Sequence, residues 1–136
     1  GRGNIINTDR YTIINDTYNS NYSSTISGIY SLRKFKNSRK IIVIADMLEL
    51  GDKAKEFHIK LLHHLIKNDI NDVFMYGHLM SYLYKYALDK MDANIFHFIN
   101  QEELIKKLNT YLRENDVIYV KGSRGMKMEN IIKGIC

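Results

Sequence analysis

The stretch KIIVIADMLELG, residues 40–51, decides the fold class of this chain. An almost unbroken apolar run leads into a carboxylate, a short apolar loop and a glycine. Strict alternation of apolar and polar residues would indicate a strand with one face in water, whereas a continuous apolar run is typical of a strand buried on both faces of a parallel sheet. Residues 40–45 are therefore predicted to form a central strand of such a sheet, ending at Asp46.

Other short apolar runs have the same character and alternate with longer amphipathic stretches. Strands are predicted at 11–15, 72–77, 94–99 and 116–122, with an edge strand in GNIINT at 3–8. Helical spacing of apolar residues occurs at 24–35, 54–68, 79–88, 102–112 and 126–135. This alternation predicts an α/β fold, a Rossmann-like, doubly wound and mostly parallel sheet of about six strands with helices on both faces. We expect residues 1–136 to form a single domain.

The composition is that of an ordinary globular domain, with 45% hydrophobic and 26% charged residues. No apolar run approaches the roughly 20 residues that span a bilayer, and no signal peptide is visible. The single cysteine, Cys136, excludes an internal disulfide framework and fits a reducing compartment, so we expect a cytoplasmic protein. Its 20 basic residues are scattered among 15 acidic ones, which argues against nucleic acid as a partner. Because the chain opens without methionine, we expect a fragment of a larger protein.

Ligands of doubly wound sheets bind beyond the carboxyl ends of the strands. Four loops qualify, which are INDTYNSN at 14–21, ADMLELGD at 45–52, GHLM at 77–80 and KGSRG at 121–125. In the first loop, Asp16 is a candidate for binding a ribose, because a carboxylate accepts hydrogen bonds from two hydroxyls. The alternative is a simple turn before a helix, which Asp and Asn favour. The second loop is expected mainly to pack, although its backbone could also cover a flat ligand ring.

The loop KGSRG offers Lys121 and Arg124 to a carboxylate or phosphate and Ser123 as a hydroxyl, and the alternative is a solvated basic loop. The phosphate-binding pattern G-x-x-x-x-G-K-[ST] does not occur in the chain. His58, His63 and His64 fall on one predicted helix without a cysteine or an H-E-x-x-H pattern. We therefore expect solvated or capping histidines and no metal site.

Three of these stretches together resemble one family. INDTYNSN resembles D-D-S-Y-N-A-N-P, VIADMLELGDKAKEFH at 43–58 resembles G-D-M-L-E-L-G followed by a histidine, and VKGSRGMKME at 120–129 resembles V-K-G-S-R-G-M-x-M-E. These runs, in this order, are similar to those of the Mur ligases, in particular the members that add D-alanyl-D-alanine to UDP-N-acetylmuramoyl-tripeptide in peptidoglycan precursor synthesis. The resemblance spans the chain. It implies the C-terminal, Rossmann-like domain of a three-domain enzyme, without the UDP-sugar domain and the central ATPase domain.

The resemblance also implies an activity. The full enzyme would be an ATP-dependent peptide ligase that phosphorylates the tripeptide carboxylate, after which the dipeptide amine attacks the acyl phosphate. ATP and Mg²⁺ would be its cofactors, with the metal ligands in the central domain. The expected partners are the two peptide substrates and the enzyme's own N-terminal and central domains, with no nucleic acid and no membrane. The isolated domain is expected to be inactive.

Site residues follow from the resemblance position by position. The implied nucleotide-binding residues are Arg2, Asp16 and Asn19. The implied substrate-binding residues are Tyr18, Asn21, Lys121, Ser123 and Arg124, and the dipeptide carboxylate would be held by Lys121 or Arg124. No catalytic residue and no metal ligand is assigned within this chain.

The chain departs from the family pattern at three places, and two other interpretations compete with it. Asn15 and Ala45 replace an aspartate and a glycine, and Tyr22 replaces a proline that would fix the helix entry. A folate polyglutamate ligase or another amino-acid ligase is one rival, against which DMLELG argues. The other is a free-standing α/β regulatory or nucleotide-binding module such as a receiver, whose first strand usually ends in paired carboxylates where this chain has only Asp16.

Overall fold

The computed structural model describes residues 4–136, which form a six-stranded sheet in the order β1-β2-β6-β3-β4-β5. The strands are β1 (Asn4–Asn7), β2 (Thr12–Asp16), β3 (Lys40–Ala45), β4 (Asp72–Tyr76), β5 (Asn94–Phe98) and β6 (Val117–Lys121). Strand β1 pairs antiparallel with β2 at one edge, and all other neighbouring strands are parallel. The predicted α/β class, the mostly parallel sheet and its edge strand are confirmed.

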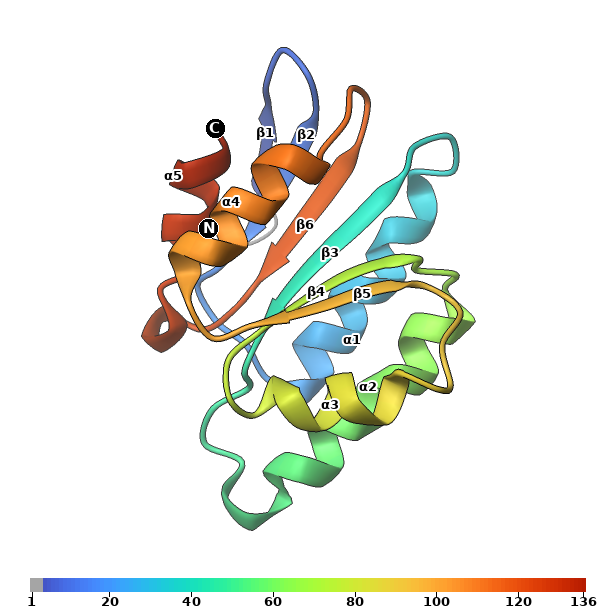
Figure 1. Cartoon of the computed structure of the whole chain (residues 1–136), viewed down its shortest axis with the longest axis vertical. Coiled ribbons are helices and arrows are strands. Elements are labelled where there is room, and N and C mark those ends of the chain that lie inside the picture. Colours follow the sequence, from blue (N-terminus) through green and yellow to red (C-terminus); the bar gives the residue numbers. More distant parts are fainter. Residues whose placement is uncertain (1–3) are drawn as a thin grey trace.

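Five α-helices cover the sheet. They are α1 (Tyr22–Ser31), α2 (Ala54–Lys67), α3 (Met80–Ala87), α4 (Gln101–Tyr111) and α5 (Glu129–Ile135), with short 3-10 turns at Leu32–Lys34, Gly51–Lys53 and Arg124–Met126. Helices α1, α2 and α3 lie on one face of the sheet, and α4 and α5 lie on the other (Figure 1). This is the predicted doubly wound arrangement. Within residues 4–136 every helix is too short or too polar to cross a bilayer.

The central strand β3 shows why its sequence is continuously apolar. Ile42 and Ile44 are fully buried in the core cluster under α1, α2 and α3. Ile41 and Val43 alternate with them and are fully buried in the cluster under α4 and α5. Since successive side chains of a strand point to opposite faces, a strand covered on both sides needs apolar residues at every position.

Helix α1 begins directly after the first polar loop. Asn21 is its N-cap: its side-chain oxygen accepts from the Ser24 N–H at 2.7 Å, and the Ser24 hydroxyl accepts from the Asn21 N–H at 3.1 Å. This reciprocal capping satisfies backbone donors that the first helical turn leaves free. Tyr22 occupies the first helical position, where the family pattern has proline, so the cap defines the helix entry without it.

Helix α5 starts three residues later than the sequence predicts, at Glu129 instead of residue 126. Lys127 adopts a left-handed backbone conformation with φ 53° and ψ 41°. A right-handed helix cannot continue through such a residue, so the prediction of a helix from residue 126 is wrong by one turn. The three residues before it, Arg124–Met126, form a separate 3-10 turn.

Candidate functional site

The first and last polar loops meet at the carboxyl edge of the sheet. Strands β2 and β6 are parallel neighbours, and their register pairs Asp16 with Lys121. Backbone hydrogen bonds continue beyond the strands, from the Gly122 N–H to the Asp16 carbonyl at 3.3 Å and from the Arg124 N–H to the Tyr18 carbonyl at 3.1 Å. Two motifs at opposite ends of the sequence therefore form one continuous surface.

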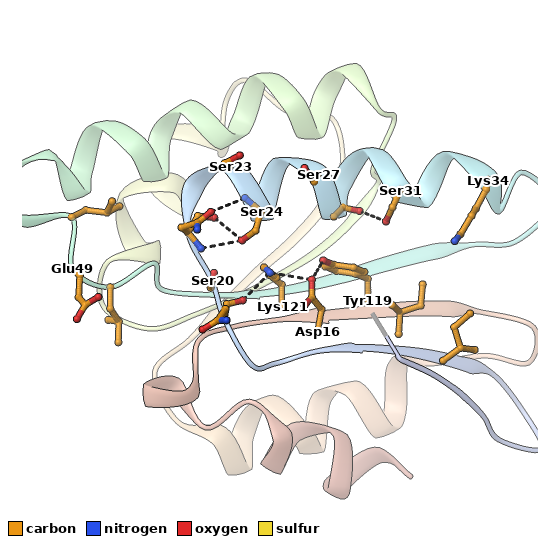
Figure 2. Close-up of a pocket in the computed structure, with 17 residues that line it drawn as sticks. Asp16, Ser20, Ser23, Ser24, Ser27, Ser31, Lys34, Glu49, Tyr119 and Lys121 are labelled. Carbon is orange, nitrogen blue, oxygen red and sulfur yellow. Dashed lines mark hydrogen bonds and ion pairs between the residues drawn. The ribbon is translucent and has the colours of Figure 1, made fainter. Parts of the chain in front are cut away.

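Asp16 is held by two donors that reach the same carboxylate oxygen. Lys121 Nζ lies 3.0 Å from Asp16 Oδ2 and also donates to the Asn19 carbonyl at 2.8 Å, while the Tyr119 hydroxyl donates to Oδ2 at 2.5 Å (Figure 2). No hydrogen bond from the described part of the chain reaches Asp16 Oδ1. The carboxylate is thus fixed in orientation and keeps one oxygen available as an acceptor.

Lys121 is enclosed by these contacts. It is only 2% exposed, and its ammonium group neutralises Asp16 and ties down the loop through Asn19. Of the two residues expected to meet a carboxylate, Lys121 therefore points into the protein. Arg124 is exposed on the neighbouring loop.

The Tyr119 hydroxyl has a raised pKa and keeps its proton. Burial raises the pKa of its hydroxyl far above the usual value of 10.0, and the hydrogen bond to Asp16 and the charge of Asp16 raise it further. The side chain lies against helix α1 at Gly28, where an added Cβ would sit 2.0 Å from the Tyr119 oxygen. A glycine within a helix lowers its stability. Glycine is nevertheless required at position 28, because the Tyr119 phenol occupies the space that a side chain would need.

Arg124 and Tyr18 form the outer part of the site. The Arg124 guanidinium carbon lies 4.8 Å from the centre of the Tyr18 ring, and Arg124 Nη1 donates to the Tyr18 hydroxyl at 3.2 Å. Tyr18 is 50% exposed, so this stacked pair projects into solvent. Next to it, Ser123 Oγ is buried and has no hydrogen-bond partner within residues 4–136.

A cavity of about 910 Å³ opens beside Asp16 and runs along helix α1. Its lining residues come from β1, β2, β6, α1, the end of the Leu32–Lys34 turn and the loops after β2 and β3. They are Ile5, Ile14, Asp16, Asn19, Ser20, Asn21, Ser23, Ser24, Ser27, Gly28, Ser31, Lys34, Leu48, Glu49, Leu50, Tyr119 and Lys121. Figure 2 shows the serines spaced along α1 above the Asp16 cluster. Its polar lining includes the Asp16 and Glu49 carboxylates, the serine hydroxyls and Lys34, which suit a polar ligand with hydroxyls.

Most residues predicted for the site lie in or beside this cavity. Asp16, Asn19, Asn21 and Lys121 line it, while Tyr18, Ser123 and Arg124 lie on the adjoining loops. The side-chain oxygen of Asn21 is used to cap α1. Arg2 lies outside the described residues.

The loop after β3 is held rigidly on its inner side. Asp46, 5% exposed, accepts hydrogen bonds from the N–H groups of Leu79 at 3.1 Å and Met80 at 2.8 Å, at the start of α3. Gly77 approaches the same carboxylate with φ +116°, and an added Cβ would lie 2.3 Å from the Asp46 carboxyl carbon. Asp46 therefore joins β3 to α3, in agreement with the expectation that this loop packs.

His58 corrects the expectation of solvated or capping histidines. It is fully buried on α2, its Nε2 accepts from the Met47 N–H at 3.0 Å, and its Nδ1 donates to the Ala54 carbonyl at 2.6 Å. Both bonds together assign the neutral tautomer with the proton on Nδ1. The sequence interpretation is wrong here because a histidine that satisfies both ring nitrogens can replace an apolar residue in the core. Across residues 4–136, no group of three or more His, Cys, Asp or Glu is placed to hold a metal ion.

Tyr119, Gly28 and the serine row are the parts of the site that sequence reasoning missed. The serines did carry a signal, because Ser20, Ser24, Ser27 and Ser31 recur at helical spacing and so share one face. Tyr119 carried none, since in the sequence it is one apolar residue within a strand.

Comparison with known proteins places this geometry in context. The family model described as "Mur ligase, glutamate ligase domain" matches residues 1–124. The UDP-N-acetylmuramoyl-tripeptide–D-alanyl-D-alanine ligase of Bacillus subtilis is 32% identical over 134 residues, covering 96% of this chain and 29% of that protein. The ligase of the same name from Buchnera aphidicola subsp. Acyrthosiphon pisum is 36% identical over 125 residues, covering 90% of this chain and 26% of that protein.

Solved structures agree with the sequence relatives. A crystal structure of the MurF ligase from Thermotoga maritima in complex with ADP superimposes with a TM-score of 0.84 at 27% identity, covering 99% of this chain and 30% of that chain. The chain thus spans less than a third of the length of the relatives that it matches.

Proposed function

The chain belongs to the Mur ligase family, as its C-terminal, glutamate ligase domain, and from that premise we propose that it is the domain that closes over ATP and positions the incoming dipeptide in a D-alanyl-D-alanine-adding ligase. The observation that carries this proposal is the oriented Asp16 carboxylate, with one free oxygen, beside the cavity along α1. In this proposal residues 1–136 are one domain of a three-domain, cytoplasmic enzyme.

Asp16 is proposed to accept hydrogen bonds from the ribose hydroxyls of ATP. Its Oδ2 is saturated by Lys121 and Tyr119, so Oδ1 is the acceptor that remains for a ligand. A carboxylate that is already oriented loses little freedom on binding, which strengthens each bond that it makes. The similar MurF ligase from Thermotoga maritima has a crystal structure in complex with ADP, which supports a nucleotide as the ligand.

Arg124 is proposed to hold the dipeptide carboxylate, in preference to Lys121. Lys121 is 2% exposed and already bonded to Asp16 and Asn19, whereas Arg124 is exposed and stacked on Tyr18. The guanidinium offers a planar pair of N–H donors that matches a carboxylate. The Ser123 hydroxyl, one residue away, is buried and unpartnered within residues 4–136, and it would donate to the same carboxylate once the loop shifts to admit the dipeptide.

The proposed reaction forms one amide bond at the expense of one phosphoanhydride bond. The tripeptide carboxylate attacks the γ-phosphorus of ATP and ADP leaves, giving an acyl phosphate. The dipeptide amine then attacks the acyl carbon, loses a proton, and expels inorganic phosphate. Residues of this chain would bind and orient the two reactants, because positioning supplies much of the acceleration when two substrates must meet. The Mg²⁺ that accompanies ATP would be held by ligands of the central domain.

The test is ligation by the full-length enzyme that contains this domain, supplied with ATP, UDP-N-acetylmuramoyl-tripeptide and D-alanyl-D-alanine. We expect amide product and stoichiometric phosphate. Asp16→Ala should raise the KM for ATP by about tenfold or more, and Arg124→Ala should raise the KM for the dipeptide by a similar factor, the effect of losing a hydrogen bond to a charged group.

Arg113→Ala is the matched control, because Arg113 is an exposed arginine at the opposite edge of the sheet. It should leave both KM values unchanged. An unaltered enzyme that makes no amide product would refute the proposed function. Normal ligation with an unchanged dipeptide KM in Arg124→Ala would refute only the role of Arg124.

A further inference from the structure

We propose that Tyr119 is a positioning residue for Asp16, and that Gly28 in helix α1 provides the space that this role requires. The inference rests on the proposed function, since it concerns how Asp16 is prepared for the nucleotide. Tyr119 does not touch the ligand atoms in this account. It acts by fixing the carboxylate that does.

Two donors are needed to fix the plane of the Asp16 side chain. Lys121 supplies a charge at 3.0 Å from Oδ2, and it is itself held by the Asn19 carbonyl at 2.8 Å. An ammonium group has little directional preference, however, so it leaves the carboxylate free to rotate about its terminal torsion. The Tyr119 hydroxyl, on the rigid strand β6, adds a second and directional bond to Oδ2 at 2.5 Å. Together they leave Oδ1 for the cavity.

The fit between Tyr119 and Gly28 is too close for any other residue at position 28. An added Cβ would lie 2.0 Å from the Tyr119 oxygen, 2.5 Å from Cζ and 3.0 Å from Cε1. These are the outer atoms of the side chain, so the conflict would move the phenol out of the position in which it bonds Asp16. A leucine at position 119 lacks all three atoms, so it would remove the conflict and the hydrogen bond together.

Tyr119 keeps its proton throughout the pH range of any ligation assay. Burial raises its pKa, and so does the neighbouring Asp16 carboxylate. The hydroxyl therefore stays protonated, and able to donate to Asp16, beyond the usual pKa of 10.0.

The first experiment uses the full-length enzyme with Tyr119→Phe, which removes the hydroxyl and keeps the ring. We expect the KM for ATP to rise about three- to tenfold, the effect of one lost hydrogen bond. The kcat at saturating ATP and the KM for D-alanyl-D-alanine should not change, because the lost contact concerns nucleotide binding alone. Tyr82→Phe is the matched control: Tyr82 is 39% exposed on α3, and its substitution should change none of these constants.

The second experiment separates packing from positioning. Gly28→Ala should lower the melting temperature and raise the KM for ATP, because the methyl group displaces the phenol. The double variant Gly28→Ala/Tyr119→Leu should recover much of the melting temperature, but its KM for ATP should stay as high as that of Tyr119→Phe. A double variant with the KM for ATP of the unaltered enzyme would overturn the inference. If Tyr119 only packed against α1, removing the clash would restore both the melting temperature and the KM for ATP.

A third measurement needs only the 136-residue chain and no ligase activity. The NMR shift of the Asp16 carboxyl carbon should change in Tyr119→Phe and stay constant in Tyr82→Phe. Constant shifts in both variants, or an unchanged KM for ATP in Tyr119→Phe, would overturn the inference while the proposed function stands. A full-length enzyme without ligase activity would instead remove the proposed function and this inference with it.

Discussion

Each end of the parallel strands carries an aspartate paired with a cation, and the two pairs differ in whether a carboxylate oxygen remains free. The two ends are called the amino edge and the carboxyl edge, after the ends of the strands that lie there. At the amino edge, Asp116 pairs with Arg39 at 2.7 Å. At the carboxyl edge, Asp16 pairs with Lys121 at 3.0 Å. In both pairs one partner is at most 3% exposed, so both are expensive to disrupt.

The pair at the amino edge is saturated. Arg39 donates through Nε to Asp116 Oδ1 at 2.9 Å and through Nη2 to Oδ2 at 2.7 Å, and the Arg113 N–H donates to Oδ2 at 2.7 Å. Arg39 Nη2 also donates to the Tyr111 carbonyl at 2.8 Å, which joins β3 to the end of α4. Every oxygen of Asp116 is used within the protein, so this cluster serves the fold.

The pair at the carboxyl edge is half saturated. Both of its donors converge on Asp16 Oδ2, and the cavity along α1 lies beside it. Similar chemistry therefore occurs in two arrangements in one sheet. One pair has all its acceptors occupied within the protein, and the other keeps a spare acceptor beside a cavity, where we propose that the nucleotide binds. The unused hydrogen-bonding capacity of Asp16, rather than the ion pair itself, is therefore the basis of the proposed nucleotide site.

The largest expected effect is on stability, from Asp116→Asn. The amide nitrogen replaces one of the two oxygens, so its hydrogens face either the Nε–H of Arg39 or the Arg113 N–H, both of which are donors. The partly buried guanidinium also loses its counter-charge. We expect the free energy of unfolding to fall by about 3 kcal/mol, as for other broken buried pairs. Urea unfolding of the 136-residue chain measures this.

Asp16→Asn is the matched comparison at the other edge. An asparagine oxygen can still accept from Tyr119 and Lys121, so no donor is turned against another donor, but the buried Lys121 ammonium loses its counter-charge. The loss should therefore be smaller than at Asp116, about 2 kcal/mol. Equal losses at the two edges would remove the distinction drawn here between a saturated and a half-saturated pair.

His58→Leu is expected to cost about 2 kcal/mol, because it leaves the buried Met47 N–H without an acceptor. Such a loss would show that the carboxyl edge also contains a purely structural contact, the bond from Met47 to His58, next to the half-saturated pair of Asp16 and Lys121. His63→Leu, on the exposed face of the same helix, should change stability by less than about 0.5 kcal/mol. A neutral His58→Leu variant would indicate that the loop after β3 does not depend on this bond.

The smallest effect concerns alkaline pH at the amino edge. Burial and the hydrogen bond from its hydroxyl to Asp72 raise the pKa of Tyr111 from 10.0 to about 12. The unfolded chain loses this proton at the lower pH, so the stabilisation is complete below pH 10 and declines as the pH rises from 10 toward 12. Tyr111→Phe should flatten that decline in a series of urea unfolding curves, and exposed Tyr82→Phe should leave the slope as it was.

Much of the fold could be predicted from the sequence because its signals are local. Continuous apolar runs follow from burial on both faces of the sheet, as at Ile41–Ile44 in β3, and amphipathic spacing follows from one covered helix face. The start of α5 was predicted one turn too early because nothing in the residue type of Lys127 reveals its left-handed conformation. Polar residues at strand ends predicted that the loops after β2 and β6 would meet, for a similar reason, since the carboxyl ends of parallel strands lie at one end of the sheet.

The different roles of the residues in the candidate site could not be predicted from local sequence signals. Lys121 and Arg124 look equivalent in KGSRG, and only the register between β2 and β6 shows that Lys121 is bound to Asp16. Likewise Gly28 reads as a weak point in a helix until Tyr119 is seen to occupy its space. Both facts depend on contacts between segments that are distant in the sequence.

The measurement that tests the central claim most directly is the KM for ATP of Asp16→Asn in the full-length enzyme, with Asp116→Asn beside it. If the spare oxygen at the carboxyl edge receives the nucleotide, Asp16→Asn should raise this KM by about tenfold or more while Asp116→Asn leaves it unchanged under conditions where both are folded. An Asp16→Asn enzyme with the KM of the unaltered enzyme would contradict the account.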